Sequence, residues 1–170
     1  MNRRHLKAYH DATTEMLDIG RYQNPIAVSL NLKKAIWPQP YNGIKFDKDW
    51  HLTGNISYFL NIINRKLLSR GENHRGLRLG TCFAYELGEF DKRPHLHGVI
   101  ECPHADLIDS VKQIVIDAWA KTPWGYRHNE IKPCDKEWAE YMLKLRTKSN
   151  FEEAVLFDFW QLPLIDQHRA

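Results

Sequence analysis

Two neighbouring segments near the middle of the chain have the residue pattern of paired β-strands, and this pair constrains the fold more than any other feature. The first segment covers residues 79–87 and the second covers residues 94–102. The stretch between them, residues 88–93, is polar and begins with Gly88, which is typical of a hairpin connection. We therefore expect two antiparallel strands whose side chains alternate between the two faces of a sheet.

The second segment contains two histidines separated by one apolar residue, His95-Leu96-His97. Because alternate side chains of a strand point the same way, both imidazoles share one face and lie about 7 Å apart along the strand. Leu96 points to the opposite face, where it can anchor the strand in a core. An antiparallel neighbour brings Glu86, on the first segment, alongside the two histidines.

Glu86, His95 and His97 predict a site for a divalent cation with two nitrogen ligands and one oxygen ligand. Such a mixed set suits Mn²⁺, Mg²⁺ or Zn²⁺. Glu89 is an alternative oxygen ligand, although its direction is less constrained because it lies in the connection. The chain has nine histidines, so a His-x-His pair can also arise by chance, and Glu86 can be an ordinary exposed carboxylate.

Length and composition predict a single domain, residues 1–170, with a core at about 25–148 and a C-terminal extension at 149–170. A chain of this length buries roughly 70% of its unfolded surface. The net charge of +3 permits a nucleic-acid partner without requiring one. No apolar run approaches the roughly 20 residues of a membrane span, so we expect no membrane association. Three cysteines without a Cys-x-x-Cys spacing fit a reducing compartment: Cys82, Cys102 and Cys134.

Apolar periodicity predicts further elements around the central hairpin. These are a strand at 25–33, helices at 50–68, 104–121 and 136–148, and a strand at 127–133. We also expect a short helix at 12–17, a polar loop at 70–78 and an extended segment at 154–164 that docks on the domain. The order strand, helix, strand, strand, helix, strand is that of a split βαβ unit. The predicted fold class is therefore α+β, with a central antiparallel sheet of ferredoxin- or RRM-like type flanked by helices.

The last predicted helix, which Asp135 is suited to cap, carries a second group of chemical interest. Tyr141, Lys144 and Lys148 follow one helical stripe, next to a buried stripe that includes Trp138. The ordinary interpretation is a half-buried tyrosine beside solvated lysines. A free tyrosine has a pKa of about 10 and needs a nearby cation, metal or base to act as a nucleophile.

Taken together, these residues resemble the HUH endonucleases, particularly the single-tyrosine rolling-circle replication initiators of plasmids and single-stranded DNA viruses. Four motifs carry the resemblance, and they span about residues 25 to 148. In chain order they are a first strand at Ile26–Asn31, the acidic ligand Glu86, the His-hydrophobe-His strand at Pro94–Gly98 and the Tyr-x-x-Lys helix at Tyr141–Lys144.

The resemblance implies that His95, His97 and Glu86 bind Mg²⁺ or Mn²⁺ and that Tyr141 attacks a phosphate of single-stranded DNA or of an origin hairpin. The products are a 5′-phosphotyrosine and a free 3′-OH, and the reverse reaction joins strands without ATP. Lys144 would position the phosphate. Such an initiator works in the cytoplasm in a bacterial, plasmid or phage context, or in the host nucleus if it comes from a eukaryotic virus.

Several departures leave alternatives open. No second tyrosine lies one helical turn from Tyr141, and no Gly-x-x-x-x-Gly-Lys motif occurs, so a helicase would be a host or separate protein or lie on a longer chain. A relaxase- or transposase-type HUH nuclease remains possible, as does a non-catalytic module that binds single-stranded nucleic acid on an RRM-like sheet. A histidine-triad hydrolase is disfavoured because Val99 stands where a third histidine is expected. Tyr126 is the next candidate nucleophile.

Polar and basic side chains near the predicted strands are expected to contact DNA, although surface charge or core packing explains each one individually. The predicted DNA-binding residues are Ser29, Asn31, Arg78, Lys92, Arg93, Arg127 and Lys148. The aromatic residues that can stack on bases are Trp37, Tyr41, Trp124 and Tyr126. The sequence indicates no particular oligomeric state.

Overall fold

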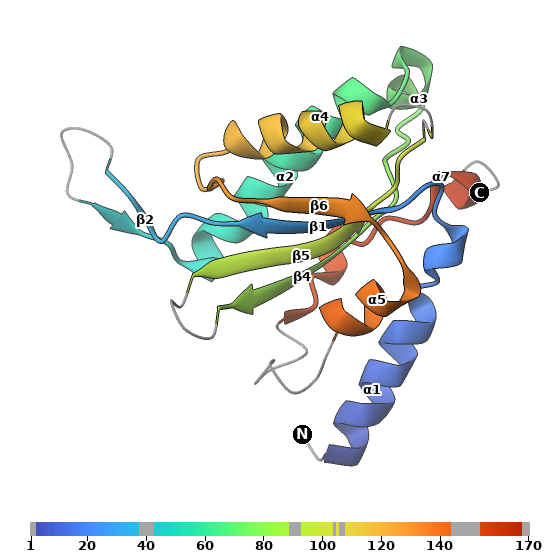
Figure 1. Ribbon diagram of the computed structural model, residues 1–170, viewed down its shortest axis with the longest axis horizontal. Helices are drawn as coiled ribbons and strands as arrows, with labels where there is room; N and C mark the ends of the chain where they lie inside the picture. The colour runs from blue at the N-terminus through green and yellow to red at the C-terminus, as the bar shows by residue number, and fades with distance from the viewer. Residues whose placement is uncertain are drawn as a thin grey trace.

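A four-stranded antiparallel sheet with strand order β4-β5-β1-β6 forms the centre of the protein (Figure 1). The computed structural model describes residues 3–37, 43–88, 93–103, 105, 108–143 and 154–167. The strands of the central sheet are β1 (Ile26–Asn31), β4 (Thr81–Leu87), β5 (Pro94–Ile100) and β6 (Glu130–Pro133). A separate two-stranded sheet consists of β2 (Ala35–Ile36) and β3 (Ile44–Lys45).

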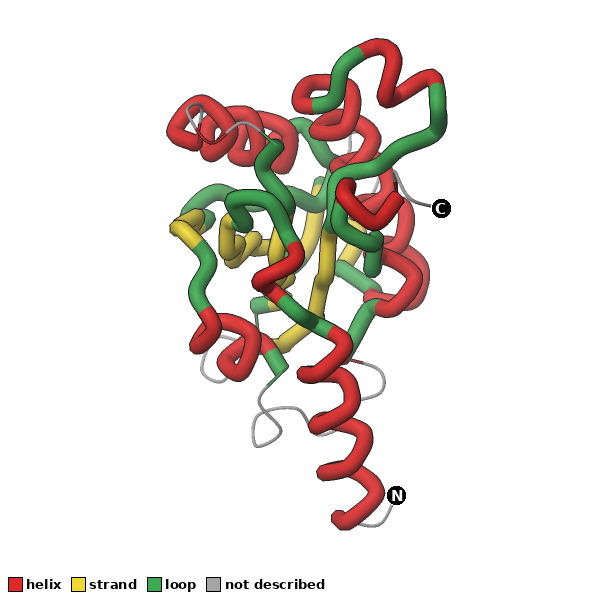
Figure 2. The backbone as a smooth tube through the Cα atoms, turned by 90° about the vertical axis from the view of Figure 1, so that its right-hand side faces the viewer, coloured by secondary structure: helices red, strands yellow, loops and turns green. Residues whose placement is uncertain are grey.

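Helices cover both faces of this sheet. Figure 1 shows α2 and α4 on one face and α5 on the other, and Figure 2 shows α1 projecting from the body of the protein. The helices are α1 (Arg3–Met16), α2 (Lys48–Leu67), α3 (Arg70–His74), α4 (Ile108–Ala120), α5 (Lys136–Met142) and α7 (Leu164–Gln167), with 3₁₀ turns η1 (Ile19–Arg21) and η4 (Phe157–Phe159). Within the described part of the chain, no helix has the length and apolar character needed to cross a membrane.

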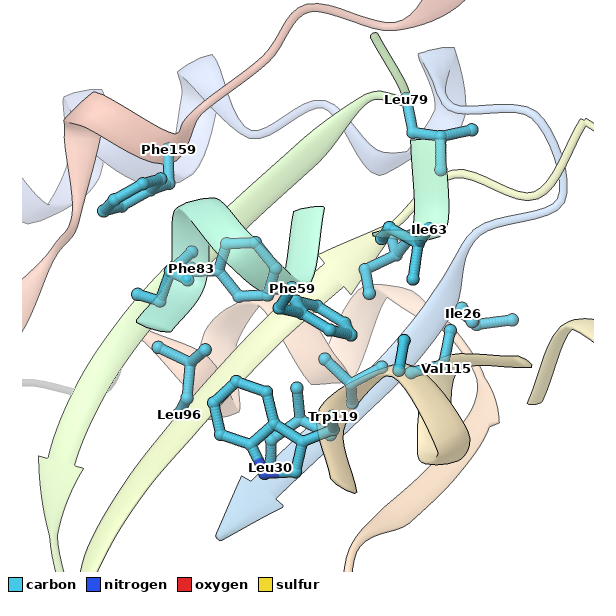
Figure 3. Packing of buried hydrophobic residues seen from close by; sticks show 14 of the residues in the cluster. Ile26, Leu30, Phe59, Ile63, Leu79, Phe83, Leu96, Val115, Trp119 and Phe159 are labelled. Atoms are coloured by element: carbon cyan, nitrogen blue, oxygen red, sulfur yellow. The ribbon is translucent and has the colours of Figure 1, made fainter. Parts of the chain in front are cut away.

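The larger hydrophobic core lies between the sheet and helices α2 and α4 (Figure 3). Alternate strand residues face these helices. Leu30 and Leu96, which are paired across β1 and β5, are two examples. From the helices, Phe59 and Trp119 pack edge to face with ring centroids 5.3 Å apart. The Trp119 indole N–H also donates to the carbonyl oxygen of Asn31 at 2.8 Å, which fixes α4 against the end of β1.

A smaller hydrophobic cluster lies between the opposite face of the sheet and α5. Small strand side chains match the bulk of the helix residues, so that the helix packs directly on the sheet. The cluster includes Ala27, Cys82, Ala84, Val99, Trp138, Met142 and Leu143. This face is the one on which alternation also places the two histidines.

The predicted fold class is confirmed. The four strands of the sheet and the helices α2 and α4 lie within four residues of their expected bounds, and the strand pairing is antiparallel throughout. All three cysteines are free. The helix predicted at 136–148 extends from Lys136 to Met142 and is followed by a turn at Leu143, and residues 144–148 lie outside the described residues.

Two helical elements were underestimated from the sequence. The short helix expected at 12–17 begins at Arg3, and an ion pair of 2.7 Å between Lys7 and Asp11, one turn apart, supports this longer helix. The polar loop expected at 70–78 begins with the short helix α3. There the Ser69 and Glu72 side chains each accept a backbone N–H of the other, which is a capping box.

The last strand of the sheet begins later than predicted, at Glu130 rather than at residue 127. His128 has a φ of 66°, which is incompatible with a strand. The preceding turn is held by β1 instead, because the Asn31 side chain donates to the carbonyl oxygen of His128 at 2.8 Å. The Asn129 side chain in turn accepts the backbone N–H of Asn31 at 2.8 Å.

The C-terminal segment docks on the domain, as expected, and it follows the outer side of β4. Val155 and Gln161 form isolated antiparallel bridges with Ala84 and Thr81. Between these two bridges the chain forms the turn η4, so the segment is less extended than predicted.

A buried carboxylate ties the C-terminal segment to the sheet. Glu101 accepts the backbone N–H groups of Gln23, Gly80 and Leu164 at 2.9 to 3.0 Å. Its side chain has no solvent exposure. Glu101, the residue directly after β5, therefore holds together segments from the N-terminal, central and C-terminal parts of the chain.

Candidate metal and nucleophile site

Strand register brings the predicted metal ligands to one place on the sheet. In the pairing of β4 with β5, Glu86 is directly opposite His95, and Ala84 is opposite His97. On the other side of β5, Ser29 pairs with His97. The expectation that Glu86 comes alongside the histidines is therefore confirmed.

The His97 ring has a contact at each of its two nitrogen atoms. Its Nε2 atom lies 3.3 Å from Oε2 of Glu86, and its Nδ1 atom lies 3.0 Å from the hydroxyl oxygen of Ser29. Both the His97 and Glu86 side chains are largely buried. A serine hydroxyl can donate or accept, so Ser29 supports either neutral tautomer of His97 and keeps its ring in one orientation.

The arrangement of Glu86 and His97 fits a divalent cation. Two ligand atoms at about 2.1 Å from one octahedral ion, at right angles, lie about 3 Å apart, which is close to the observed 3.3 Å. The His95 ring lies beside them, with its centroid 6.1 Å from that of His97. Within the described residues, no three His, Cys, Asp or Glu side chains form a group that could hold a metal ion. Glu86 and His97 are thus brought into contact, while His95 lies next to this pair without completing a three-ligand group.

Helix α5 places Tyr141 against His97. The two rings meet edge to face with centroids 5.6 Å apart, and the Tyr141 side chain is 45% exposed. The Tyr141 ring also stacks on Trp138, with centroids 5.1 Å apart and planes 25° from parallel. The predicted nucleophile and the predicted metal ligands therefore share one face of the sheet.

Two anchors set the position of α5. The Asp135 side chain accepts the backbone N–H of Trp138 at 2.9 Å, so the predicted cap is confirmed. The Trp138 indole N–H donates to the carbonyl oxygen of Gly98 at 3.0 Å. This second bond joins the helix to the strand that carries both histidines. The sequence predicted Trp138 only as part of a buried stripe and did not predict that it positions Tyr141. Its place one helical turn before Tyr141 is the sequence feature that could have indicated this role.

The sheet face next to the site is apolar and buried. Burial raises the pKa of the Cys82 thiol well above its usual value, with a smaller contribution from nearby Cys134. The pKa of Cys134 is itself raised to about 12, first by burial and then by Asp135. Both side chains are therefore neutral thiols at physiological pH and add no charge beside Glu86 and His97.

A basic and aromatic group borders the site at the end of β1. The Arg93 guanidinium lies over the Tyr126 ring at 4.2 Å from its centroid, and Arg127 approaches the same ring at 5.9 Å. The backbone N–H of Tyr126 donates to the carbonyl oxygen of Asn31 at 2.8 Å. Because Asn31 pairs with His95, the structure brings two predicted DNA-binding arginines and one predicted stacking residue beside the histidines.

Other predicted DNA-binding residues have different surroundings. The Ser29 hydroxyl contacts His97, and the Asn31 side chain holds the turn at His128. Arg78 is not near the site, because it precedes Thr81 at the opposite end of β4 from Glu86. Its guanidinium donates to the carbonyl oxygen of its own neighbour, Leu77, at 2.8 Å.

Several predicted residues lie outside the part of the chain that the structure describes. They are Glu89, the alternative metal ligand, the stacking candidate Tyr41, and the basic residues Lys92, Lys144 and Lys148. Of the remaining stacking candidates, Trp37 is exposed and Trp124 is buried in the larger core.

Comparisons of the chain with protein-family models, with curated proteins and with solved structures found no match.

Proposed function

We propose that the protein is a metal-dependent, single-stranded DNA nickase and strand-joining enzyme of the HUH type that acts through Tyr141 and initiates rolling-circle replication. The observation that carries the proposal is the contact of three groups on one sheet face. Glu86 contacts Nε2 of His97, and the Tyr141 ring packs against the same imidazole. A tyrosine beside a carboxylate and two histidines is suited to phosphoryl transfer with a divalent ion.

The reaction exchanges one phosphodiester for another. The phenolic oxygen of Tyr141 forms a bond to phosphorus, the bond from phosphorus to the 3′-oxygen breaks, and that oxygen takes up a proton as the phenol loses one to solvent. Glu86, His95 and His97 would hold a divalent ion, and such an ion would polarise the phosphate oxygens. Trp138 holds the Tyr141 ring in place, and Ser29 orients His97.

The arrangement favours an enzyme over a non-catalytic binding module. A module that only binds nucleic acid has no need of a largely buried carboxylate against a largely buried histidine, because neither group then contacts the ligand. The same chemistry serves replication, transposition and conjugation. The lack of a second tyrosine one helical turn from Tyr141 is the feature of the sequence that favours a replication initiator within the family that it resembles.

The direct test is a covalent adduct. The protein is incubated with Mn²⁺ and single-stranded DNA labelled at the 3′ end, because the fragment downstream of the cut stays on the tyrosine. We expect a labelled band that resists SDS, requires Mn²⁺ and is lost with EDTA. Tyr141→Phe should abolish the band, while the matched variant Tyr126→Phe should retain it.

Two results would count against this assignment. A band that survives Tyr141→Phe and disappears in Tyr126→Phe would move the nucleophile to Tyr126. No band with a broad library of strands and hairpins would favour the non-catalytic binding module.

A further inference from the structure

A second site candidate lies on the other face of the sheet from Tyr141. A cavity of about 430 Å³ opens between the first half of α2 and the residues that follow α4. Five residues of α2, from Trp50 to Tyr58, line one side, and Lys121, Pro123 and Trp124 line the other. None of these residues takes part in the proposed nicking reaction.

Helix α2 forms a notch between two exposed aromatic side chains. Trp50, Gly54 and Tyr58 are spaced four residues apart, so they share one face of the helix about 6 Å apart along its axis. A β-carbon added at Gly54 would meet no atom within 4 Å. The Trp50 side chain is 85% exposed and the Tyr58 side chain is 50% exposed. Large exposed aromatic groups around an open space are typical of a binding site.

Asn55, one of the residues that line the cavity, carries an unpaired hydrogen-bond donor. Asn55 is only 3% exposed, and its side-chain oxygen accepts the backbone N–H of Trp124 at 2.9 Å. Its amide nitrogen has no hydrogen-bond partner among the described residues. A buried polar group without a partner is rare in folded proteins. Because this nitrogen is itself shielded from solvent, a ligand acceptor in the cavity would pair with it after a small shift of the Asn55 side chain.

The walls and rim define the chemistry of the ligand. Aromatic rings line both sides, since Trp50, His51 and Tyr58 come from α2 and Trp124 lines the other side. The His51 and Trp124 rings lie 4.4 Å apart. Lys121 adds a positive charge at the exposed rim. A flat heterocycle with an acceptor on its edge and a phosphate beside it fits these groups, and an unpaired nucleotide has all three features.

The start of α2 and the end of α4, next to which the cavity opens, lie at the same end of the sheet as the start of β5, which carries the histidines (Figure 1). Leu32, which follows β1, bridges to Gly125, and the backbone N–H of Tyr126 donates to the carbonyl oxygen of Asn31. Trp124, in the cavity wall, is two residues from Tyr126, or at most about 7 Å along the backbone. A strand that crosses the active site beside Arg93 and Tyr126 can therefore continue into the cavity.

We propose that this cavity binds an unpaired base of the single-stranded DNA, several nucleotides from the phosphate that Tyr141 attacks. The inference rests on the proposed function for the identity of the ligand. The cavity would be a second binding site, apart from the reacting phosphate, and it would raise the affinity of the protein for single-stranded DNA.

The test fills the notch without disturbing the core. Gly54→Leu places a side chain in open space and replaces a poor helix former with a good one, so the variant should fold at least as well as the natural chain. Ser57→Leu adds the same side chain at an exposed position of α2 outside the cavity. Affinity for a labelled 20-nucleotide single strand is measured by fluorescence anisotropy. We expect Gly54→Leu to weaken binding about tenfold, while Ser57→Leu changes it less than twofold.

A second measurement does not depend on nicking. Binding of a six-nucleotide oligothymidylate should quench tryptophan fluorescence, and Trp50→Phe should remove most of that quenching. At saturating DNA, the rate of adduct formation in Gly54→Leu should stay within about twofold of the natural rate, because the cavity lies away from the reacting groups.

The outcomes separate the two proposals. Equal affinities of Gly54→Leu and Ser57→Leu for the 20-nucleotide strand, with normal adduct formation, would overturn the cavity assignment and leave the nicking proposal standing. Quenching that requires Trp50, without any adduct, would support the cavity and count against the nicking proposal. A Gly54→Leu variant that changes the sedimentation coefficient but not the affinity for DNA would make the cavity a contact between copies of the chain and overturn the inference.

Discussion

The indole N–H of Trp138 donates to the carbonyl oxygen of Gly98, the residue directly after His97. This bond fixes α5 to the histidine strand, while the same indole ring stacks on Tyr141. The distance between the proposed nucleophile and the proposed metal ligands thus depends on a residue that need not touch the substrate.

Trp138→Phe is expected to retain an aromatic ring under Tyr141 but to lose the hydrogen bond to Gly98. The free energy of unfolding should fall by about 1 kcal/mol, while the turnover rate for adduct formation falls at least fivefold with little change in KM. Urea unfolding and single-turnover adduct assays measure the two effects. A change in stability with an unaltered turnover rate would show that Trp138 is only structural.

Ser29→Ala removes the hydroxyl that orients the His97 ring. Loss of such a partner typically lowers metal affinity 10- to 100-fold, and we expect Mn²⁺ binding measured by calorimetry to weaken within this range. Ser29→Thr keeps a hydroxyl at the same position and serves as the matched control. The interpretation fails if the alanine and threonine variants bind Mn²⁺ equally well.

Gly98→Ala should destabilise the sheet, because the added β-carbon would lie 2.3 Å from a ring carbon of Phe83. Phe83 pairs directly with Gly98 across β4 and β5. Overpacking of this kind costs about 1–3 kcal/mol. Gly54→Ala, on an open helix surface, should instead raise stability by about 1 kcal/mol. Thermal unfolding of the two variants tests whether the two changes have opposite signs.

Glu101→Gln replaces a buried carboxylate that accepts three backbone N–H groups. One carboxylate oxygen becomes an NH₂ group that cannot accept a hydrogen bond. If Oε2 is replaced, the N–H groups of Gly80 and Leu164 lose their acceptor, and if Oε1 is replaced, the N–H group of Gln23 does. We expect a loss of about 3 kcal/mol in urea unfolding. Limited proteolysis should also cut near Leu164 before the rest of the chain, and uniform resistance along the chain would contradict this role.

Stability should decline on the alkaline side. The pKa of Cys134 is raised from 9.0 to about 12 by burial and by Asp135, and burial also raises the pKa of Cys82. The folded state therefore keeps protons that the unfolded state releases, so this stabilisation is complete below pH 9 and is lost as the pH rises toward 12. Thermal unfolding between pH 8 and pH 11 should show a falling midpoint. Cys134→Ala should reduce the slope, and an equal slope in that variant would contradict the assignment.

The alternation of residues was sufficient to predict the sheet and the shared face of the histidines. A strand has a period of two, so the relative faces of Leu96, His97 and Glu86 follow from local sequence once the hairpin is assumed. The apolar periodicity that predicts α2 is equally local, and Ile56, Phe59, Ile63 and Leu67 are buried at helical spacing.

Contacts between distant segments could not be predicted in the same way. Ser29 and His97 are 68 residues apart, and Trp138 and Gly98 are 40 residues apart. Periodicity assigns a side chain to a face but does not determine which of its neighbours on that face it contacts. The turn at His128 was missed for a related reason, because its positive φ is maintained by hydrogen bonds from Asn31 and not by a glycine.

The position of the C-terminal segment along β4 has a consequence for how the protein behaves in solution. β4 is an outer strand of the sheet. On its side away from β5, the backbone groups of Thr81 and Phe83 form hydrogen bonds with the backbone of Gln161 and Leu156. An uncovered strand of this kind is a template for pairing with another chain. A version of the protein that ends before residue 154 would therefore tend to self-associate through β4. The C-terminal segment thus prevents edge-to-edge aggregation by covering this strand.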